Sequence, residues 1–198
     1  MAIEDRRERE RAARRRLIID TARALAEAEG WDAVTTRRLS TEIEYSQPVL
    51  YKHFAGMEQI AAAVAIDGFD ELTEAMRTAR AVTSTAGADV TLTRISRAYL
   101  DFARDNPAVY DAMFTRTTTL RFAAEDTPPQ LSAAFAQLRR AVEAVARHRD
   151  ADTLTEVLFS SLHGLVTLGR AGRVRPGYDT ERLDLLIDQF AGGGAAPR

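Results

Sequence analysis

The 198 residues correspond to one large domain or two smaller ones, and 45% hydrophobic with 28% charged residues is the usual composition of a soluble globular protein. The sequence has no cysteine, which excludes disulfides, thiol nucleophiles and Cys-ligated metals, and its three histidines lie too far apart to indicate a zinc site. A formal net charge of −2 gives no overall indication of nucleic-acid binding.

The start of the sequence is rich in arginine. Seven arginines fall within residues 6–16, namely Arg6, Arg7, Arg9, Arg11, Arg14, Arg15 and Arg16. Such a segment can neutralise DNA phosphates, but the interleaved Glu8 and Glu10 also fit the solvated start of a helix, so both interpretations stay open. No apolar stretch typical of a secretory signal follows, and the longest apolar run, residues 60–66, is too short to cross a membrane. We therefore expect a cytoplasmic protein.

Helical periodicity covers most of the chain, and no strand alternation is present. Thr35 or Thr36 can cap the second helix and Ser46 the third, whose first turn contains Pro48. The pattern predicts an all-α fold of about nine helices: one ending at Gly30, then 36–43, 46–53, 57–81, 89–105, 107–114, 129–145, 152–173 and 178–190.

Two short helices and a turn lie close together near the start of the chain. The helix over residues 36–43, the turn Glu44-Tyr45 and the helix over residues 46–51 have the spacing of a helix-turn-helix. Helix hairpins are common, so this spacing alone leaves DNA binding as one interpretation among several.

The residues of this segment resemble the TetR family of transcriptional regulators. Residues 35–40 (TTRRLS) and 45–54 (YSQPVLYKHF) are similar to the family pattern T-x-R-x-I-A, a turn, then V-S-x-x-x-L-Y-x-H-F. The resemblance covers residues 17–64 closely, and Leu162-His163-Gly164 is weakly similar to a Trp-His-Gly signature of some C-terminal domains. It implies a DNA-binding domain over residues 1–56, a helical ligand-binding and dimerisation domain over 57–192, and a disordered tail over 193–198.

Two positions depart from the family pattern. The turn usually holds glycine because its backbone favours positive φ, whereas this sequence has Glu44. The helix after the recognition helix usually opens with lysine, whereas this sequence has Met57. We therefore expect a strained or reshaped turn, and the loss of one phosphate contact that Lys52 or the arginine-rich start can replace.

The resemblance places candidate DNA contacts on both helices of the motif. The start of the recognition helix faces base edges in the major groove, where Gln47 can bind adenine and Val49 a thymine methyl. The threonines have capping as an alternative role, and the Tyr51 ring can pack while its hydroxyl stays free. The expected core comprises Leu39, Ile43, Leu50 and Phe54. The full candidate set is Thr35, Thr36, Arg37, Ser46, Gln47, Pro48, Val49, Tyr51, Lys52 and His53.

Aromatic and long apolar side chains are frequent in the second half of the chain. They can form a plain helical core or line a pocket for a mostly apolar or aromatic effector. His163 is then either a satisfied core histidine or a group that orients the ligand, while His148 is expected at the surface. The resemblance implies a pocket with Phe69, Met76, Tyr99, Phe102, Tyr110, Met113, Phe114, Phe135 and His163 as candidate lining, and Phe122 is a further aromatic of this half.

The last two helices carry apolar residues on more than one face. Leu154, Val157, Leu158, Leu162, Leu165, Val166 and Leu168 belong to the first, and Leu183, Leu185, Leu186, Ile187 and Phe190 to the second. Two such helices suit a two-fold four-helix interface, as the family uses it, and a homodimer suits a palindromic operator.

These observations predict a ligand-responsive, dimeric DNA-binding regulator, a repressor released from double-stranded operator DNA by a small apolar effector. Ligand binding is expected to tilt the helix over residues 57–81 and to change the spacing of the two recognition helices. One alternative is a helical ligand-binding module with vestigial DNA binding. Another is a small all-helical enzyme, for which we find no catalytic, metal-binding or phosphate-binding motif. No cofactor, metal or membrane partner is expected.

Overall fold

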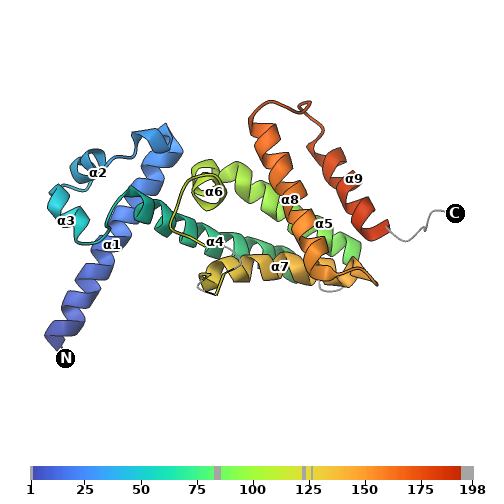
Figure 1. Ribbon diagram of the computed structural model, residues 1–198, viewed down its shortest axis with the longest axis horizontal. Coiled ribbons are helices and arrows are strands. Elements are labelled where there is room, and N and C mark those ends of the chain that lie inside the picture. Colours follow the sequence, from blue (N-terminus) through green and yellow to red (C-terminus); the bar gives the residue numbers. More distant parts are fainter. Residues whose placement is uncertain (1, 83–85, 122–123, 126, 193–198) are drawn as a thin grey trace. The chain divides into compact units, whose positions relative to one another are not determined.

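The computed structural model describes residues 2–82, 86–121, 124–125 and 127–192. Within these ranges the chain forms nine α-helices, one 3₁₀ turn and no β-strand (Figure 1), which confirms the predicted all-α fold. The helices are α1 (Ala2–Glu29), α2 (Thr36–Glu42), α3 (Gln47–Tyr51), α4 (Met57–Ala81), α5 (Ala88–Asp105), α6 (Pro107–Phe114), α7 (Pro129–Ala146), α8 (Ala151–Arg170) and α9 (Asp179–Gly192), with the 3₁₀ turn η1 (Trp31–Ala33) after α1. Phe122 and the predicted tail over 193–198 lie outside the described residues.

The helix ends follow the sequence signals closely, with three differences. The arginine-rich start is helical from Ala2 onward, so it is the first part of α1 and not an irregular arm. The turn η1 was not predicted. Helix α8 ends at Arg170, three residues earlier than expected. Among the described residues, no helix combines the length and the apolar composition needed to cross a membrane.

The chain divides into two compact units. The first contains Met1–Gly68 and Asn106–Pro128, and the second contains Phe69–Asp105 and Pro129–Arg198. Helix α4 therefore contributes to both, and α6 belongs to the same unit as the short helices α2 and α3. The boundary after residue 56, which separates the expected DNA-binding domain from the expected ligand-binding domain, stays a prediction.

In the first unit, α1 packs on η1, α2 and α6, and α2 packs on α3. The apolar stripe of α1 includes Ile18 and Ala22, both with no exposed surface. All four side chains predicted for the motif's core are buried, namely Leu39, Ile43, Leu50 and Phe54. The short helices α2 and α3 are thus held by their apolar faces, which leaves their polar faces to solvent.

Three side chains spaced four residues apart attach the beginning of α6 to α1 and η1. Arg23 donates from Nη2 to Asn106 Oδ1 at 2.9 Å. The Glu27 carboxylate accepts from the backbone N–H groups of Ala108 and of the residue after it, both at 3.1 Å. Trp31 donates from Nε1 to the Ala108 carbonyl at 2.7 Å. Glu27 thereby serves as the cap that Asn106 does not provide, since no Asn106 side-chain cap bond is formed. We call Arg23, Glu27 and Trp31 the α6 clamp.

In the second unit, α5 packs on α7, α8 and α9, and α7 packs on α8 and α9. Some apolar residues predicted for the dimer interface are core residues of this unit: Leu158, Leu162, Leu183, Ile187 and Phe190 are buried. Others are exposed, namely Val157, Leu168 and Leu185. The multi-faced apolar pattern therefore combines a core face with an exposed face on each of α8 and α9.

Candidate nucleic-acid interface

The turn between α2 and α3 keeps its geometry without glycine. Glu44 has φ 56°, in the left-handed region. Its N–H bonds to the Thr41 carbonyl at 3.3 Å, and the Tyr45 N–H bonds to the Ser40 carbonyl at 3.0 Å, which together form a Schellman motif at the end of α2. Of the two expected alternatives, a strained or a reshaped turn, this is the strained one, and a non-glycine residue there costs roughly 1–2 kcal/mol.

Helix α2 begins with a threonine cap. Thr35 Oγ1 accepts from the Arg38 N–H at 3.1 Å, so Thr35 rather than Thr36 is the capping residue. Arg37 is exposed, and its guanidinium forms no ion pair with any residue that the structure describes. Arg38 is engaged with Glu42 at 2.8 Å and Glu29 at 3.1 Å. Arg37 is therefore the available cation at this end of α2.

Helix α3 exposes its first residues. Ser46, Gln47 and Pro48 are exposed and Val49 is half-buried. The predicted Ser46 side-chain cap is wrong, since Ser46 makes no such bond. Pro48 has no N–H to donate, and the Val49 N–H already bonds to the Ser46 backbone carbonyl at 2.9 Å. The Ser46 hydroxyl thus takes no part in capping its own helix.

The far end of α3 carries Tyr51, Lys52 and His53. Tyr51 is 53% exposed, which favours the reading in which its hydroxyl is free. Lys52 is exposed and His53 is half-buried. Met57 is the first residue of α4, as the family pattern places its lysine, and it brings no charge to that position.

A shallow hollow of about 400 Å³ lies between the first half of α1 and the end of α3, and we call it the basic hollow. Three arginines on successive turns of α1 line one side of it, namely Arg7, Arg11 and Arg14. Its lining is Arg7, Glu10, Arg11, Arg14, Lys52 and His53. The i, i+4, i+7 spacing of the arginines was visible in the sequence, but their position opposite Lys52 and His53 was not.

His53 has an altered acidity at this hollow. Burial of the ring is the main cause that lowers the pKa of His53 below 6.5, and the charges of Arg11, Arg14, Arg15 and Lys52 lower this pKa further. Its Nδ1 is buried and has no hydrogen-bond partner, while its backbone carbonyl accepts from Arg15 at 2.9 Å. The ring is therefore neutral at pH 7 in the free chain.

The candidate effector-lining residues fall in both units. Phe69, Met76, Tyr99, Phe102, Phe135 and His163 belong to the second unit, and Tyr110, Met113 and Phe114 to the first. In the first unit, the Tyr110 and Phe114 rings contact each other with centroids 4.8 Å apart. Most of these side chains are buried, which is what both a core and a closed pocket require.

Phe159, which the sequence did not single out, joins two of these candidates. Its ring meets Tyr99 edge-on at 6.3 Å and stacks on His163 at 6.0 Å. Burial and then the charge of Arg170 lower the pKa of His163 below its ordinary value. A neutral imidazole among aromatic rings is a suitable hydrogen-bonding group for an uncharged molecule.

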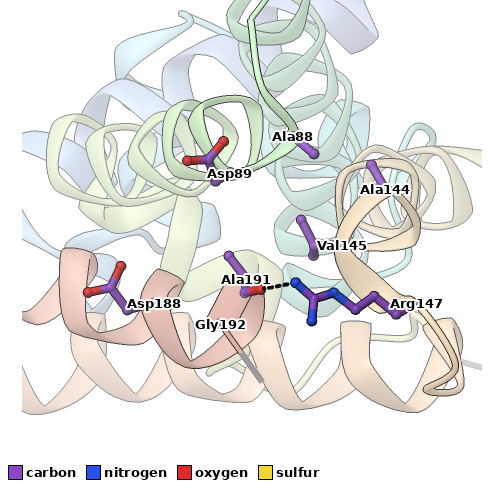
Figure 2. A pocket seen from close by; sticks show the side chains of 8 residues that line it. All are labelled: Ala88, Asp89, Ala144, Val145, Arg147, Asp188, Ala191 and Gly192. Carbon is purple, nitrogen blue, oxygen red and sulfur yellow. Dashed lines mark hydrogen bonds between the residues drawn. The ribbon is translucent and has the colours of Figure 1, made fainter. Parts of the chain in front are cut away.

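A second hollow, of about 540 Å³, lies between the start of α5, the end of α7 and the end of α9 (Figure 2). It is polar in part, and Arg147 donates there to the Ala191 carbonyl at 3.4 Å. Its lining contains no predicted effector residue and consists of Ala88, Asp89, Ala144, Val145, Arg147, Asp188, Ala191 and Gly192. Among the described residues, no group of three or more His, Asp or Glu side chains is arranged to hold a metal ion.

A helix-turn-helix with an exposed recognition helix, followed by a larger helical part, defines a DNA-binding transcriptional regulator. Two family models match: residues 18–64 match the bacterial regulatory proteins of the tetR family, and residues 92–190 match the tetracyclin repressor-like C-terminal domain. An uncharacterized HTH-type transcriptional regulator of Bacillus subtilis (strain 168), YobS, is 31% identical over 77% of this chain and 77% of its own length. The chain belongs to the TetR family.

Solved structures share the fold. A protein of unknown function from Rhodococcus sp. RHA1 superposes with a TM-score of 0.75 at 26% identity, over 92% of this chain and 95% of that one. The TetR family regulator PfmR from Thermus thermophilus gives a TM-score of 0.60 at 18% identity, over 92% and 97%. These likenesses agree with the all-α fold, while the family models and the Bacillus subtilis relative confirm the resemblance found in residues 17–64.

Proposed function

We propose that this chain acts as a homodimeric repressor that leaves a palindromic operator when a small apolar or aromatic effector binds. The observation that carries the proposal is the division of α3 into a packed face and an exposed beginning. Leu50 is buried while Gln47 and Pro48 are exposed, so the side chains that can meet base edges are held on a fixed support. Vestigial DNA binding is the alternative, and specific, salt-sensitive binding to a selected duplex separates it from this proposal.

In this proposal the two ends of α3 have different tasks. Ser46, Gln47, Pro48 and Val49 read bases, with Gln47 bidentate to adenine. Tyr51, Lys52 and His53 at the other end of α3 position the protein on phosphates, together with Thr35, Thr36 and Arg37 at the start of α2. Helix α3 has five residues and is only about 7.5 Å long, so both of its ends fit along one major groove and its edge.

Two alanine variants test this division. Gln47→Ala is expected to weaken the best site by about 1–3 kcal/mol and to relax one position of the half-site, because a base contact is lost. Lys52→Ala is expected to weaken all sequences alike and to lower the salt slope, because a phosphate contact is lost. Selection from random duplexes, followed by affinity measurements at several salt concentrations, separates the two. If Gln47→Ala kept the preferred site and the affinity of the wild type, Gln47 would not contact a base.

The proposed dimer interface uses the exposed apolar side chains of the last two helices. Val157 is 50% exposed, Leu168 48% and Leu185 65%. Val157 and Leu168 lie eleven residues apart in α8, which is three helical turns and therefore the same face. A second copy that covers these residues would remove them from water, as a homodimer interface does.

A charge in this surface should separate the copies. Val157→Glu and Leu185→Glu are expected to give monomers that no longer bind the operator tightly, because a buried unpaired carboxylate is costly. Leu158→Glu is not a suitable probe, since Leu158 is fully buried in its own unit. Val82→Glu is the matched control, because Val82 is 68% exposed and lies outside α8 and α9. Light scattering of the wild type and variants gives the mass, and a monomeric wild type would contradict the dimer.

The proposed effector is uncharged and mostly apolar. The candidate residues of the second unit are Phe69, Met76, Tyr99, Phe102, Phe135 and His163, and they include no carboxylate, lysine or arginine. A charged ligand would require buried partners, since an unpaired buried charge is unstable. His163 is the proposed polar anchor because its lowered pKa keeps the imidazole neutral.

Release of the operator reports on the effector directly. We expect apolar and aromatic compounds from a chemically diverse panel to release the protein from its selected duplex, measured by fluorescence anisotropy. The release should show no requirement for a divalent metal. Release by metal ions or by nucleotide phosphates alone would contradict an apolar pocket and would favour a plain core role for these side chains.

A further inference from the structure

The basic hollow holds positive charge that the protein itself does not compensate. Four cations line it, namely Arg7, Arg11, Arg14 and Lys52, against the single carboxylate of Glu10. Glu10 is already paired with Arg6 at 3.5 Å. In the part of the chain that the structure describes, none of the four lining cations forms an ion pair or a side-chain hydrogen bond.

The arginines of the hollow come from one face of α1. Residues 7, 11 and 14 are separated by four and three positions, so their side chains point in similar directions. Arg9 is two positions from both Arg7 and Arg11 and therefore lies on the opposite face, where it donates to the Asp5 carbonyl at 3.2 Å. The first part of α1 thus has one face directed to the hollow and another directed away.

His53 closes the hollow from the end of α3. Its Nδ1 is enclosed without a hydrogen-bond partner, and its backbone is fixed by the bond from Arg15. Arg15 also lies over the Phe54 ring at 4.0 Å, so this stretch of backbone is held on α1. The charged groups that face the imidazole are Arg11, Arg14 and Arg15 of α1 and Lys52 beside it, with Glu10 as the carboxylate of the hollow.

We propose that the basic hollow binds one phosphate of the operator backbone, and that His53 takes up a proton from solvent when the phosphate is seated. This proposal rests on the operator binding described under the proposed function. A DNA phosphate suits this position. The basic hollow adjoins the last residues of α3, whereas Gln47 lies at the first, and the sugar-phosphate backbone borders the major groove that α3 is proposed to enter. The arginines of the basic hollow would also provide a phosphate contact from α1, which replaces the one that Met57 does not provide.

The direction of the proton uptake follows from the charges. In the free chain, burial and the surrounding cations hold the pKa of His53 below 6.5. A phosphate in the hollow offsets those cations and stabilises the imidazolium, so the pKa rises in the complex. Operator affinity should therefore increase as pH falls from the bound pKa toward the free pKa. One proton taken up per chain corresponds to at most about a tenfold gain per pH unit and per chain.

Arg11→Ala and Arg9→Ala form a matched pair for the test, since each removes one charge from the same helix. The probe is the duplex selected by the wild-type protein. Arg11→Ala is expected to lower the salt slope by up to about 0.9 per bound chain and to leave the preferred sequence unchanged. It should also raise the pKa of His53 in the free chain. Arg9→Ala should leave both quantities as in the wild type, and circular dichroism should show all three proteins folded.

Histidine NMR titrations provide the second measurement. The His53 resonance is assigned by its absence in His53→Asn and is followed from pH 5 to 8 with and without duplex. A higher pKa in the complex is the expected result. An unchanged pKa of His53 on duplex binding, or equal salt slopes for Arg9→Ala and Arg11→Ala, would overturn the proposed phosphate binding in the basic hollow. The proposed base contact of Gln47 would still stand. Failure of the wild type to select any sequence would overturn the proposed function as well.

Discussion

Replacing Trp31 by alanine is expected to lower the free energy of unfolding by about 3–5 kcal/mol. Trp31 is buried at 8% exposure and fills the junction between α1 and α6 within the first unit. Its loss leaves a cavity and also leaves the Ala108 carbonyl without the donor that now lies at 2.7 Å. An unsatisfied buried carbonyl adds to the cost of the cavity.

Thermal and urea unfolding followed by circular dichroism measure this effect, because the sole tryptophan of the sequence is absent from the variant and cannot serve as a fluorescent probe. Trp31→Phe is the control that keeps an aromatic ring but not the N–H donor, and it should cost less than Trp31→Ala. A loss under about 1 kcal/mol for Trp31→Ala, as at a surface position, would contradict the α6 clamp as a stabilising contact.

The second large effect is expected at Gly68. A Cβ built on Gly68 would overlap Val109 Cγ1 and would lie 2.8 Å from Met113 Sδ, so α4 and α6 approach each other there without a side chain between them. Gly68→Leu should therefore lower the free energy of unfolding by about 3 kcal/mol, at the upper end for overpacked cores. Val109 and Met113 are both buried, which limits their freedom to move aside.

Gly169→Leu is the matched control for this substitution. Gly169 lies in α8, and a Cβ there has no neighbouring atom within 4 Å. The same change should stabilise α8 by up to about 1 kcal/mol, because glycine is a poor helix former. Opposite signs for the two variants in parallel thermal unfolding are expected. Equal effects would show that α6 moves away from α4 without loss.

The extent of the fold that the sequence predicts follows from the range of the interactions involved. Apolar periodicity, glycine and proline act within one or two helical turns, and they placed the long helices and the short helix after Pro107 within a few residues. The family resemblance left a strained or a reshaped turn open at Glu44, and its φ of 56° is the strained alternative. The predicted side-chain cap at Ser46 was wrong for a reason that is also local, since Pro48 has no N–H and the Val49 N–H bonds to the Ser46 backbone carbonyl.

Contacts between distant segments were not predictable from one sequence. Glu27 looks like an ordinary polar residue of α1, yet its partners in α6 lie 81 and 82 positions away. For the same reason the sequence showed the arginine spacing in α1 but not that Lys52 and His53 face it across the basic hollow. Nor does it show that α6, with Tyr110 and Met113, belongs to the unit that contains the helix-turn-helix.

The composition of the basic hollow has a chemical consequence. Lys52 is the only lysine among the 27 basic side chains that are lysine or arginine, and it lines this hollow at the end of α3. A reagent that acylates side-chain amines therefore has one target, and the reaction removes one positive charge from the surface proposed to meet DNA. If Lys52 meets the operator as proposed, its protection from acylation reports operator occupancy directly. By the same chemistry, we expect acetylation of Lys52 alone to weaken DNA binding.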